Sequence, residues 1–345
     1  MKKQTRTIFI AILIGLFSLV LIVVGYGALT FFSGFNVDKT VYILIDKNKN
    51  YNEVLSQLES KTHISNIESF NRTAKFFDYP QDIKSGRYAI TPHTTILQFV
   101  RILKNGSQTP VKLKFNNLRT KGDLTERLSS QLMISNQELG ETLNDSLKCV
   151  EYGFTIESIG CMFIPNTYEV YWDVSLRDFL SKMYAEYKKF WTESRLNKAK
   201  EIGLTPTEVS ILASIVEEEC FFSDEYPIVA GLYLNRLNKN MLLQADPTIK
   251  FSINDFSIKR ILGKHIEQAK DSPYSTYAHK GLPPGPIRIP SIKAIDAVLN
   301  PVKSDYIFMC AKEDFSGRHN FAITLAEHEQ NRVRYHNALN QRKIF

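Results

Sequence analysis

The sequence has few of the short motifs that indicate a particular chemistry. None of its four cysteines (Cys149, Cys161, Cys220 and Cys310) belongs to a C-x-x-C pair or a histidine-rich cluster, so their spacing does not favour a metal site. A G-x-S-x-G turn for a nucleophilic serine and a glycine-rich phosphate loop are also missing. Basic residues rarely cluster beyond pairs, so the net charge of +7 gives little support for nucleic-acid binding. We therefore expect no cofactor, no metal and no nucleic-acid partner.

One long apolar run stands near the N-terminus. Residues 8–32 contain no charged side chain, and roughly 20 apolar residues suffice to cross a bilayer. The run is longer than the roughly 7–15 residues of a signal-peptide core, although a cleaved signal is the alternative. Lys2, Lys3 and Arg6 precede it, which places the N-terminus in the cytoplasm and the remainder outside. We predict a single-pass anchor, with cysteines outside the membrane that could pair in three ways. We favour buried thiols, because a chain of this size does not need disulfides.

The residues after the anchor divide into a smaller and a larger part. Patterns of strands at 40–45 and 111–115, of a turn at Gly86 and a short strand within 83–90, and of helices at 52–61, 67–77 and 96–105 predict a compact α+β unit. The remainder mixes helices, among them a long one over 176–195, with short strands and a proline-rich loop over 281–290. The length suggests about two domains. We predict an α+β protein with a tip and anchor (1–36), a small module (37–116) and a larger domain (117–345).

Three consecutive glutamates end a predicted helix in the larger part. The segment LTPTEVSILASIVEEEC (204–220) begins with Thr205 as a cap, followed by proline and a glutamate at the third helical position. At roughly 100° per residue, Glu219 falls inside the apolar arc, whereas Glu217 and Glu218 fall at its edges. A carboxylate on an apolar face loses hydration, which raises its pKa and suits it to general acid catalysis. A frayed helix end, or an ion pair with Arg236, would explain the position of Glu219 without catalysis. We expect Glu218 to be solvated and Glu217 to face a cleft.

Polar and aromatic residues follow that helix. Gln244, Asp246 and Thr248 alternate, so on an extended segment they would share a face suited to a hydroxyl-rich ligand, although a turn capped by Asp246 is the alternative. Tyr274 and Tyr277 adjoin the proline-rich loop, as in sugar or peptide clefts and also in packed loops. Further on, we predict a strand that carries His319 and Phe321 and a final helix that carries Glu327, His328 and Asn331. These residues lack the i, i+4 histidine pair of a zinc helix, so they do not predict a metal site.

These segments together resemble one family, the membrane-anchored endolytic peptidoglycan transglycosylases of the MltG (YceG-like) type. The matching stretches occur in the family's order: ILASIVEEE (211–219), LYLNRL (232–237), LLQADPT (242–248), SPYSTY (272–277), GLPPGPI (281–287) and HNFAITLAEH (319–328). FIPNTYEVY (163–171) differs from the family by Asn166 where an aspartate is usual, and the C-terminal HEQN replaces "H-N". Residues 83–106 resemble the family's LysM-like module.

The resemblance implies a lytic transglycosylase in the cytoplasmic (inner) membrane, with its catalytic domain on the periplasmic or extracytoplasmic side. Such enzymes cut the β-1,4 bond between N-acetylmuramic acid and N-acetylglucosamine in nascent strands and leave 1,6-anhydro ends. The family's catalytic glutamate corresponds to Glu219. The implied substrate-binding residues are Glu217, Gln244, Asp246, Thr248, Tyr274 and Tyr277. Implied partners are glycan strands and peptidoglycan synthases. Two alternatives are a hydrolytic glycosidase that pairs Glu219 with Asp246, and a non-catalytic wall-binding scaffold.

Overall fold

The computed structural model describes residues 2–62, 64, 67–116 and 118–342. The chain divides into two compact units. The first contains Met1–Lys112, Gln131–Met133 and Glu169–Val174, and the second contains Leu113–Ser130, Ile134–Tyr168 and Ser175–Phe345. Helices and short antiparallel strands occur in both, so the α+β prediction is confirmed.

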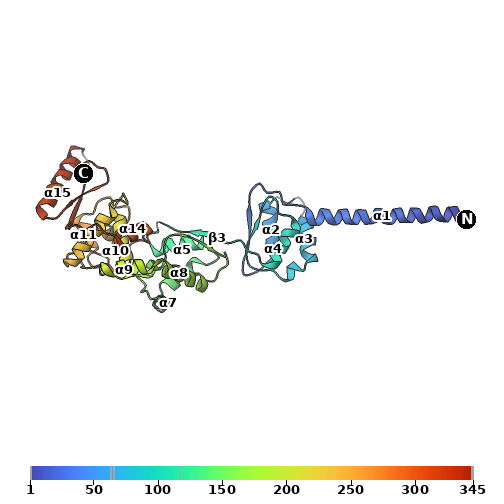
Figure 1. Cartoon of the computed structure of the whole chain (residues 1–345), viewed down its shortest axis with the longest axis horizontal. Helices are drawn as coiled ribbons and strands as arrows, with labels where there is room; N and C mark the ends of the chain where they lie inside the picture. Colours follow the sequence, from blue (N-terminus) through green and yellow to red (C-terminus); the bar gives the residue numbers. More distant parts are fainter. Residues whose placement is uncertain (1, 63, 65–66, 117, 343–345) are drawn as a thin grey trace. The chain divides into compact units, whose positions relative to one another are not determined.

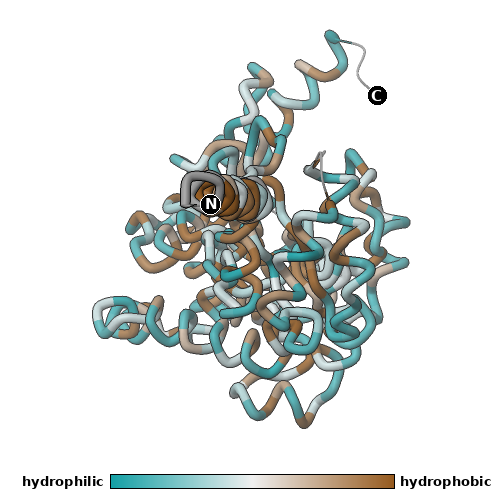
Figure 2. The backbone as a smooth tube through the Cα atoms, turned by 90° about the vertical axis from the view of Figure 1, so that its right-hand side faces the viewer, coloured by the Kyte–Doolittle hydropathy of each residue, from teal (hydrophilic) through white to brown (hydrophobic). Residues whose placement is uncertain are grey.

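A long apolar helix, α1 (Lys2–Phe32), opens the first unit (Figure 1). Within Ile8–Phe32, the most apolar 18-residue window has a mean hydropathy of 3.1 and no buried residue, and this helix is mostly brown in Figure 2. At about 1.5 Å per residue, 25 residues are long enough to cross the roughly 30 Å core of a bilayer. Length and composition therefore fit a membrane span, although a signal sequence would fit them too.

The remainder of the first unit is a two-stranded sheet covered by helices. β1 (Val41–Ile45) pairs antiparallel with β2 (Gly86–Ile90), beside α2 (Tyr51–Thr62), α3 (Ile67–Phe76), the short helix η1 (Tyr79–Gln81) and α4 (Ile96–Asn105). Ile43, Leu58, Phe70 and Phe99 are fully buried between these elements. The predicted strands and helices of this region are confirmed, and no end differs by more than three residues.

The second unit is mostly helical. Its first part contains α5 (Lys121–Ser129), α6 (Asn136–Leu143), α7 (Ser146–Glu151), η2 (Ile159–Met162), α8 (Leu176–Phe190) and α9 (Glu193–Glu201). α10 (Pro206–Glu219), α11 (Tyr226–Asn238), α12 (Asp246–Ile253), α13 (Gly263–Gln268) and α14 (Ile292–Leu299) follow. The last elements are β5 (Phe308–Ala311), antiparallel to β6 (His319–Ala322), and α15 (Leu325–Gln341), which contacts both strands. The strands β3 (Val111–Lys114) and β4 (Thr167–Val170), each of which has residues in both units, pair with one another.

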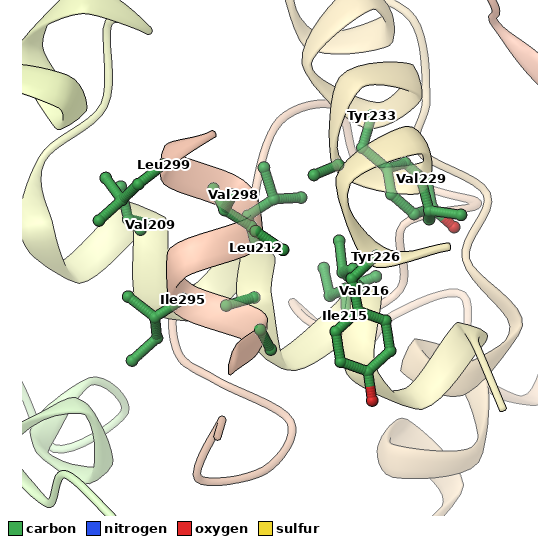
Figure 3. Packing of buried hydrophobic residues seen from close by; sticks show 14 of the residues in the cluster. Val209, Leu212, Ile215, Val216, Tyr226, Val229, Tyr233, Ile295, Val298 and Leu299 are labelled. Atoms are coloured by element: carbon green, nitrogen blue, oxygen red, sulfur yellow. The ribbon is translucent and has the colours of Figure 1, made fainter. Parts of the chain in front are cut away.

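The core of the second unit lies between α10, α11 and α14 (Figure 3). Every residue of α10 from Val209 to Val216 is buried. Its start is fixed by the predicted capping box, in which the Thr205 side chain accepts from the Glu208 backbone N–H. α11 approaches a neighbouring loop closely at Gly231, where an added Cβ would lie 2.3 Å from the carbonyl oxygen of Val302.

Three local expectations have clear outcomes. The single helix predicted over 176–195 is wrong: α8 ends at Phe190, and Thr192 caps a new helix, α9. Of the two alternatives for the segment through Asp246, the extended one is wrong, because α12 starts there with Pro247 in its first turn, a position that favours helix initiation. The cysteines are confirmed as free thiols, of which Cys310 alone is only partly buried.

Candidate functional site

Glu219 is the last residue of α10, and Cys220 after it is extended. Its Oε1 accepts a hydrogen bond of 2.7 Å from the hydroxyl of Tyr233 on α11. Tyr233 is buried in the core of the second unit (Figure 3). The position of the Glu219 carboxyl is therefore fixed by two packed helices, and its hydrogen-bond partner is Tyr233 rather than Arg236.

The surroundings of Glu219 raise the pKa of its carboxyl into the neutral range. Burial raises its pKa to about 7, and the charges of Asp246 and Glu218 act in the same direction. The hydrogen bond from Tyr233 and the charge of Lys250 oppose the rise. The C-terminal end of α10 also disfavours a negative charge, because unpaired carbonyl groups point there. Such a carboxyl is partly protonated at neutral pH and can donate a proton.

The carboxyl lines a cavity of about 400 Å³, here called the Glu219 cavity. α11 supplies Leu232, Tyr233 and Arg236, and the segment before α12 supplies Leu243 and Gln244. The other lining residues are Asp246, Tyr277, Met309, Cys310, Ala311, His319 and His328. The cavity therefore combines one raised-pKa carboxyl with a second carboxyl, an arginine, two phenols and two imidazoles.

Arg236 supports one wall of the cavity. It is buried, and its guanidinium donates to the carbonyl oxygens of Ile307 at 2.6 Å, Leu242 at 3.0 Å and Leu243 at 2.9 Å. It also donates to Oε1 of Gln244 at 3.2 Å, which orients that side-chain amide. Burial lowers the pKa of Arg236. All of the hydrogen-bond acceptors of Arg236 among the described residues are neutral. Its positive charge therefore favours a negatively charged group elsewhere in the cavity.

Asp246 and Tyr277 form a second pair in the cavity. The Tyr277 hydroxyl donates to Asp246 Oδ1 at 2.6 Å. Burial and then the charge of Asp246 raise the pKa of Tyr277, so the phenol stays protonated and the carboxylate keeps its donor. Together with Gln244, these side chains give the cavity several hydrogen-bonding groups for hydroxyl-rich ligands.

Three other predicted binding residues lie outside the Glu219 cavity. Thr248 is fully buried and bonds to the carbonyl oxygen of Ala245 at 2.7 Å. Tyr274 lines a different cavity of about 480 Å³. Glu217 accepts the backbone N–H of Ser291 at 2.7 Å, which caps the start of α14. The structure thus brings Gln244, Asp246, Tyr277 and Glu219 together and places the other three elsewhere.

The expectation of a solvated Glu218 is wrong. Its side chain is only 16% exposed, and Oε1 accepts a hydrogen bond of 2.6 Å from Arg288. Arg119 makes a second ion pair with it at 3.2 Å. Both arginines are remote in sequence, so the periodicity of α10 gives no sign of them. Glu218 is a structural ion-pair residue beside the acid.

The sequence did not assign several side chains that the structure places in the cavity. Tyr233 lies in the LYLNRL stretch (232–237) on α11, and no local sequence signal marks its hydroxyl. Nδ1 of His319 lies 3.1 Å from Oε2 of Glu225, which is buried. His328 stacks on Phe308 with ring centroids 5.1 Å apart, and burial lowers its pKa.

Comparison with known proteins gives consistent matches. A family model described as the YceG-like family matches residues 43–334. The endolytic murein transglycosylase of Streptococcus pneumoniae serotype 2 (strain D39 / NCTC 7466) is 26% identical over 331 residues, which cover 86% of this chain and 58% of that protein. The endolytic murein transglycosylase of Bacillus subtilis (strain 168) is 32% identical over 170 residues, 49% of this chain and 46% of that protein. The chain thus spans about half to three-fifths of the length of these curated relatives.

A solved structure shows the same fold. The crystal structure of a yceG-like protein from Listeria monocytogenes aligns with a TM-score of 0.54 at 24% identity. The alignment covers 85% of this chain and 99% of that one. At this identity the likeness concerns the fold alone.

Proposed function

The chain belongs to the YceG-like family, and from this membership and the geometry of its cavity we propose that it is a lytic transglycosylase of peptidoglycan. Its curated relatives carry the name endolytic murein transglycosylase. The proposed substrate is the glycan strand, cut between N-acetylmuramic acid and N-acetylglucosamine. The observation that carries the proposal is the Glu219 carboxyl, with its pKa raised to about 7, in the wall of a polar cavity.

The proposed reaction needs one group that first donates and then accepts a proton. Glu219 gives its proton to the glycosidic oxygen as the bond from that oxygen to C1 of the muramoyl residue breaks. The oxygen of the C6 hydroxyl then bonds to C1, and the hydroxyl proton returns to the Glu219 carboxylate. The products are a 1,6-anhydro end and a new N-acetylglucosamine hydroxyl, so no water is consumed. A pKa near the working pH suits both transfers.

The other cavity residues have proposed binding roles. Gln244, Asp246 and Tyr277 supply hydrogen-bonding groups from one side of the Glu219 cavity. Tyr274 would contact a more distant part of the strand from its own cavity, and Thr248 would act through the packing of α12. We retain Glu217 as a residue that sets the position of α14 rather than one that touches the sugar.

The remaining parts of the proposal concern location and partners. We propose that α1 anchors the chain in the cytoplasmic membrane with the catalytic domain (117–345) outside. Residues 37–116 would act as a LysM-like module that holds glycan. Peptidoglycan synthases, which make the nascent strands, are the proposed protein partners.

A hydrolytic glycosidase is the second candidate, because Asp246 lines the same cavity as Glu219 and hydrolases use two carboxyl groups. Mass spectrometry of digested glycan strands separates the two reactions. Anhydro ends support transglycosylation, whereas reducing ends, each heavier by one water, would establish hydrolysis. A chain that binds glycan without any cleavage would be the scaffold.

The Glu219→Gln variant tests the assignment of the acid, with Glu217→Gln as the matched control. We expect the first to abolish cleavage and the second to retain it. If Glu219→Gln cleaves normally while Glu217→Gln does not, the acid is misassigned although the reaction class stands. Binding of both variants to glycan strands, measured by cosedimentation, shows whether the loss lies in catalysis.

A further inference from the structure

A histidine paired with a buried carboxylate lines the Glu219 cavity and has no part in the single-acid reaction. His319 lies on β6 and lines the cavity. Glu225, just before the first turn of α11, is 5% exposed and makes two contacts with His319. Its Oε1 accepts the His319 backbone N–H at 3.0 Å, and its Oε2 lies 3.1 Å from the ring Nδ1.

This contact fixes the tautomer and the orientation of the imidazole. Because a carboxylate only accepts hydrogen bonds, Nδ1 of the neutral ring carries the proton and donates to Oε2. Nε2 is then the basic nitrogen, and it has no hydrogen-bond partner among the described residues. The ring cannot turn freely, since the backbone and the ring of His319 both bind Glu225. A carboxylate that orients a histidine in this way also stabilises the imidazolium that forms when the ring accepts a proton.

The neighbouring charged groups are paired with each other and not with Glu225 or His319. Arg318, next to His319, forms an ion pair of 2.9 Å with Asp224, next to Glu225. The Cys220 thiol also lies near Glu225, and burial raises the pKa of that thiol, which keeps it neutral. The direct partner of the Glu225 side chain is therefore the His319 imidazole.

We propose that His319 relays a proton in the reaction that Glu219 starts. After Glu219 has protonated the leaving oxygen, Nε2 of His319 takes the proton of the muramoyl C6 hydroxyl as that oxygen bonds to C1. The imidazolium then returns this proton to the Glu219 carboxylate, so both groups regain their initial states. Glu225 is a positioning residue that fixes the tautomer. This inference rests on the proposed transglycosylase function and refines the route of the second proton.

The test uses the full chain in detergent with purified glycan strands as substrate. General acid–base groups contribute about 10²–10⁴-fold to rate, so we expect His319→Ala to lower kcat by about 100-fold or more with little change in KM. Added imidazole should restore a large part of the lost rate, because it can occupy the space of the missing ring. His279→Ala, which removes an exposed histidine outside the cavity, is the matched control and should retain the rate.

Several outcomes would overturn the relay. A His319→Ala enzyme with nearly normal kcat, a loss confined to KM, or a folded variant that imidazole does not restore would each do so. A thermal melt checks that the variant folds. Glu225→Gln keeps an oxygen acceptor for one N–H, so its kcat should fall less than that of His319→Ala. If Glu225→Gln instead raises KM by the same factor as it lowers kcat, Glu225 is a structural residue and not a positioning residue.

Failure of this inference is distinguishable from failure of the proposed function. If the wild-type chain releases no anhydro ends, the proposed function itself fails. If the wild type releases anhydro ends and His319→Ala does so at the same rate, the relay alone is wrong.

Discussion

Removal of the Tyr233 hydroxyl should move the pH at which the enzyme loses activity. This hydroxyl donates to Oε1 of Glu219 and opposes the rise of its pKa. A hydrogen bond to an ionised group contributes about 1.5–3 kcal/mol, and one pKa unit corresponds to about 1.36 kcal/mol. Tyr233→Phe should therefore raise the pKa of Glu219 from about 7 by about one to two units. The phenyl ring keeps the packing between α10 and α11, so the change is mainly electrostatic.

The measurement is the pH dependence of kcat/KM for glycan cleavage. The reaction requires protonated Glu219, so wild-type activity falls as the pH rises through about 7. In Tyr233→Phe the same fall should occur at higher pH, and the variant should exceed the wild type under mildly alkaline conditions. Tyr277→Phe is the control, because its hydroxyl donates to Asp246 instead and its removal should leave the midpoint nearly in place. An unmoved or lowered midpoint in Tyr233→Phe would refute the assignment of Glu219 as the titrating acid.

Three further predictions concern stability. The pKa of Glu219 rises from 4.5 to about 7 on folding, so its stabilising contribution is full below about pH 4.5 and is lost as the pH rises through about 7. Urea unfolding should show Glu219→Gln gaining about 3 kcal/mol relative to the wild type between about pH 4 and pH 8. Arg288→Met leaves two largely buried carboxylates without their shared cation, and should lower the free energy of unfolding by about 3 kcal/mol at neutral pH. Gly231→Ala drives a Cβ against the carbonyl oxygen of Val302 and should destabilise the chain by about 1–3 kcal/mol in calorimetry, whereas Gly140→Ala, with open space around it in α6, should stabilise it by up to about 1 kcal/mol.

Local patterns predicted much of the secondary structure. The capping box at Thr205 and the apolar spacing after it define α10, and the same spacing turns Glu219 away from its two neighbours. The break between α8 and α9 was missed because Thr192 caps a helix in the middle of an otherwise continuous periodic pattern. The start of α12 was missed because Gln244, Asp246 and Thr248 alternate as residues on one face of a strand do. This alternation extends over too few residues to distinguish a strand from a helix.

The cavity contacts depend on residues that are distant in sequence. Glu218 meets Arg288 seventy residues later, and His319 meets Glu225 ninety-four residues earlier. No periodic pattern encodes such pairs, since they exist only after the helices and the β5–β6 hairpin have packed. Sequence reasoning could identify the acid on its helix, but the phenol, the arginine and the imidazole around it require the tertiary structure.

The two fixed ends of α10 restrict how its gene segment can change. Thr205 sets where the helix begins, and Glu219 must face Tyr233 where it ends. Each added or deleted residue turns everything after it by about 100°, which would present Glu218 or Cys220 to the tyrosine and swing the acid out of its cavity. The segment can therefore accept many substitutions on its packed faces, but insertions and deletions within it should be selected against as strictly as loss of the glutamate.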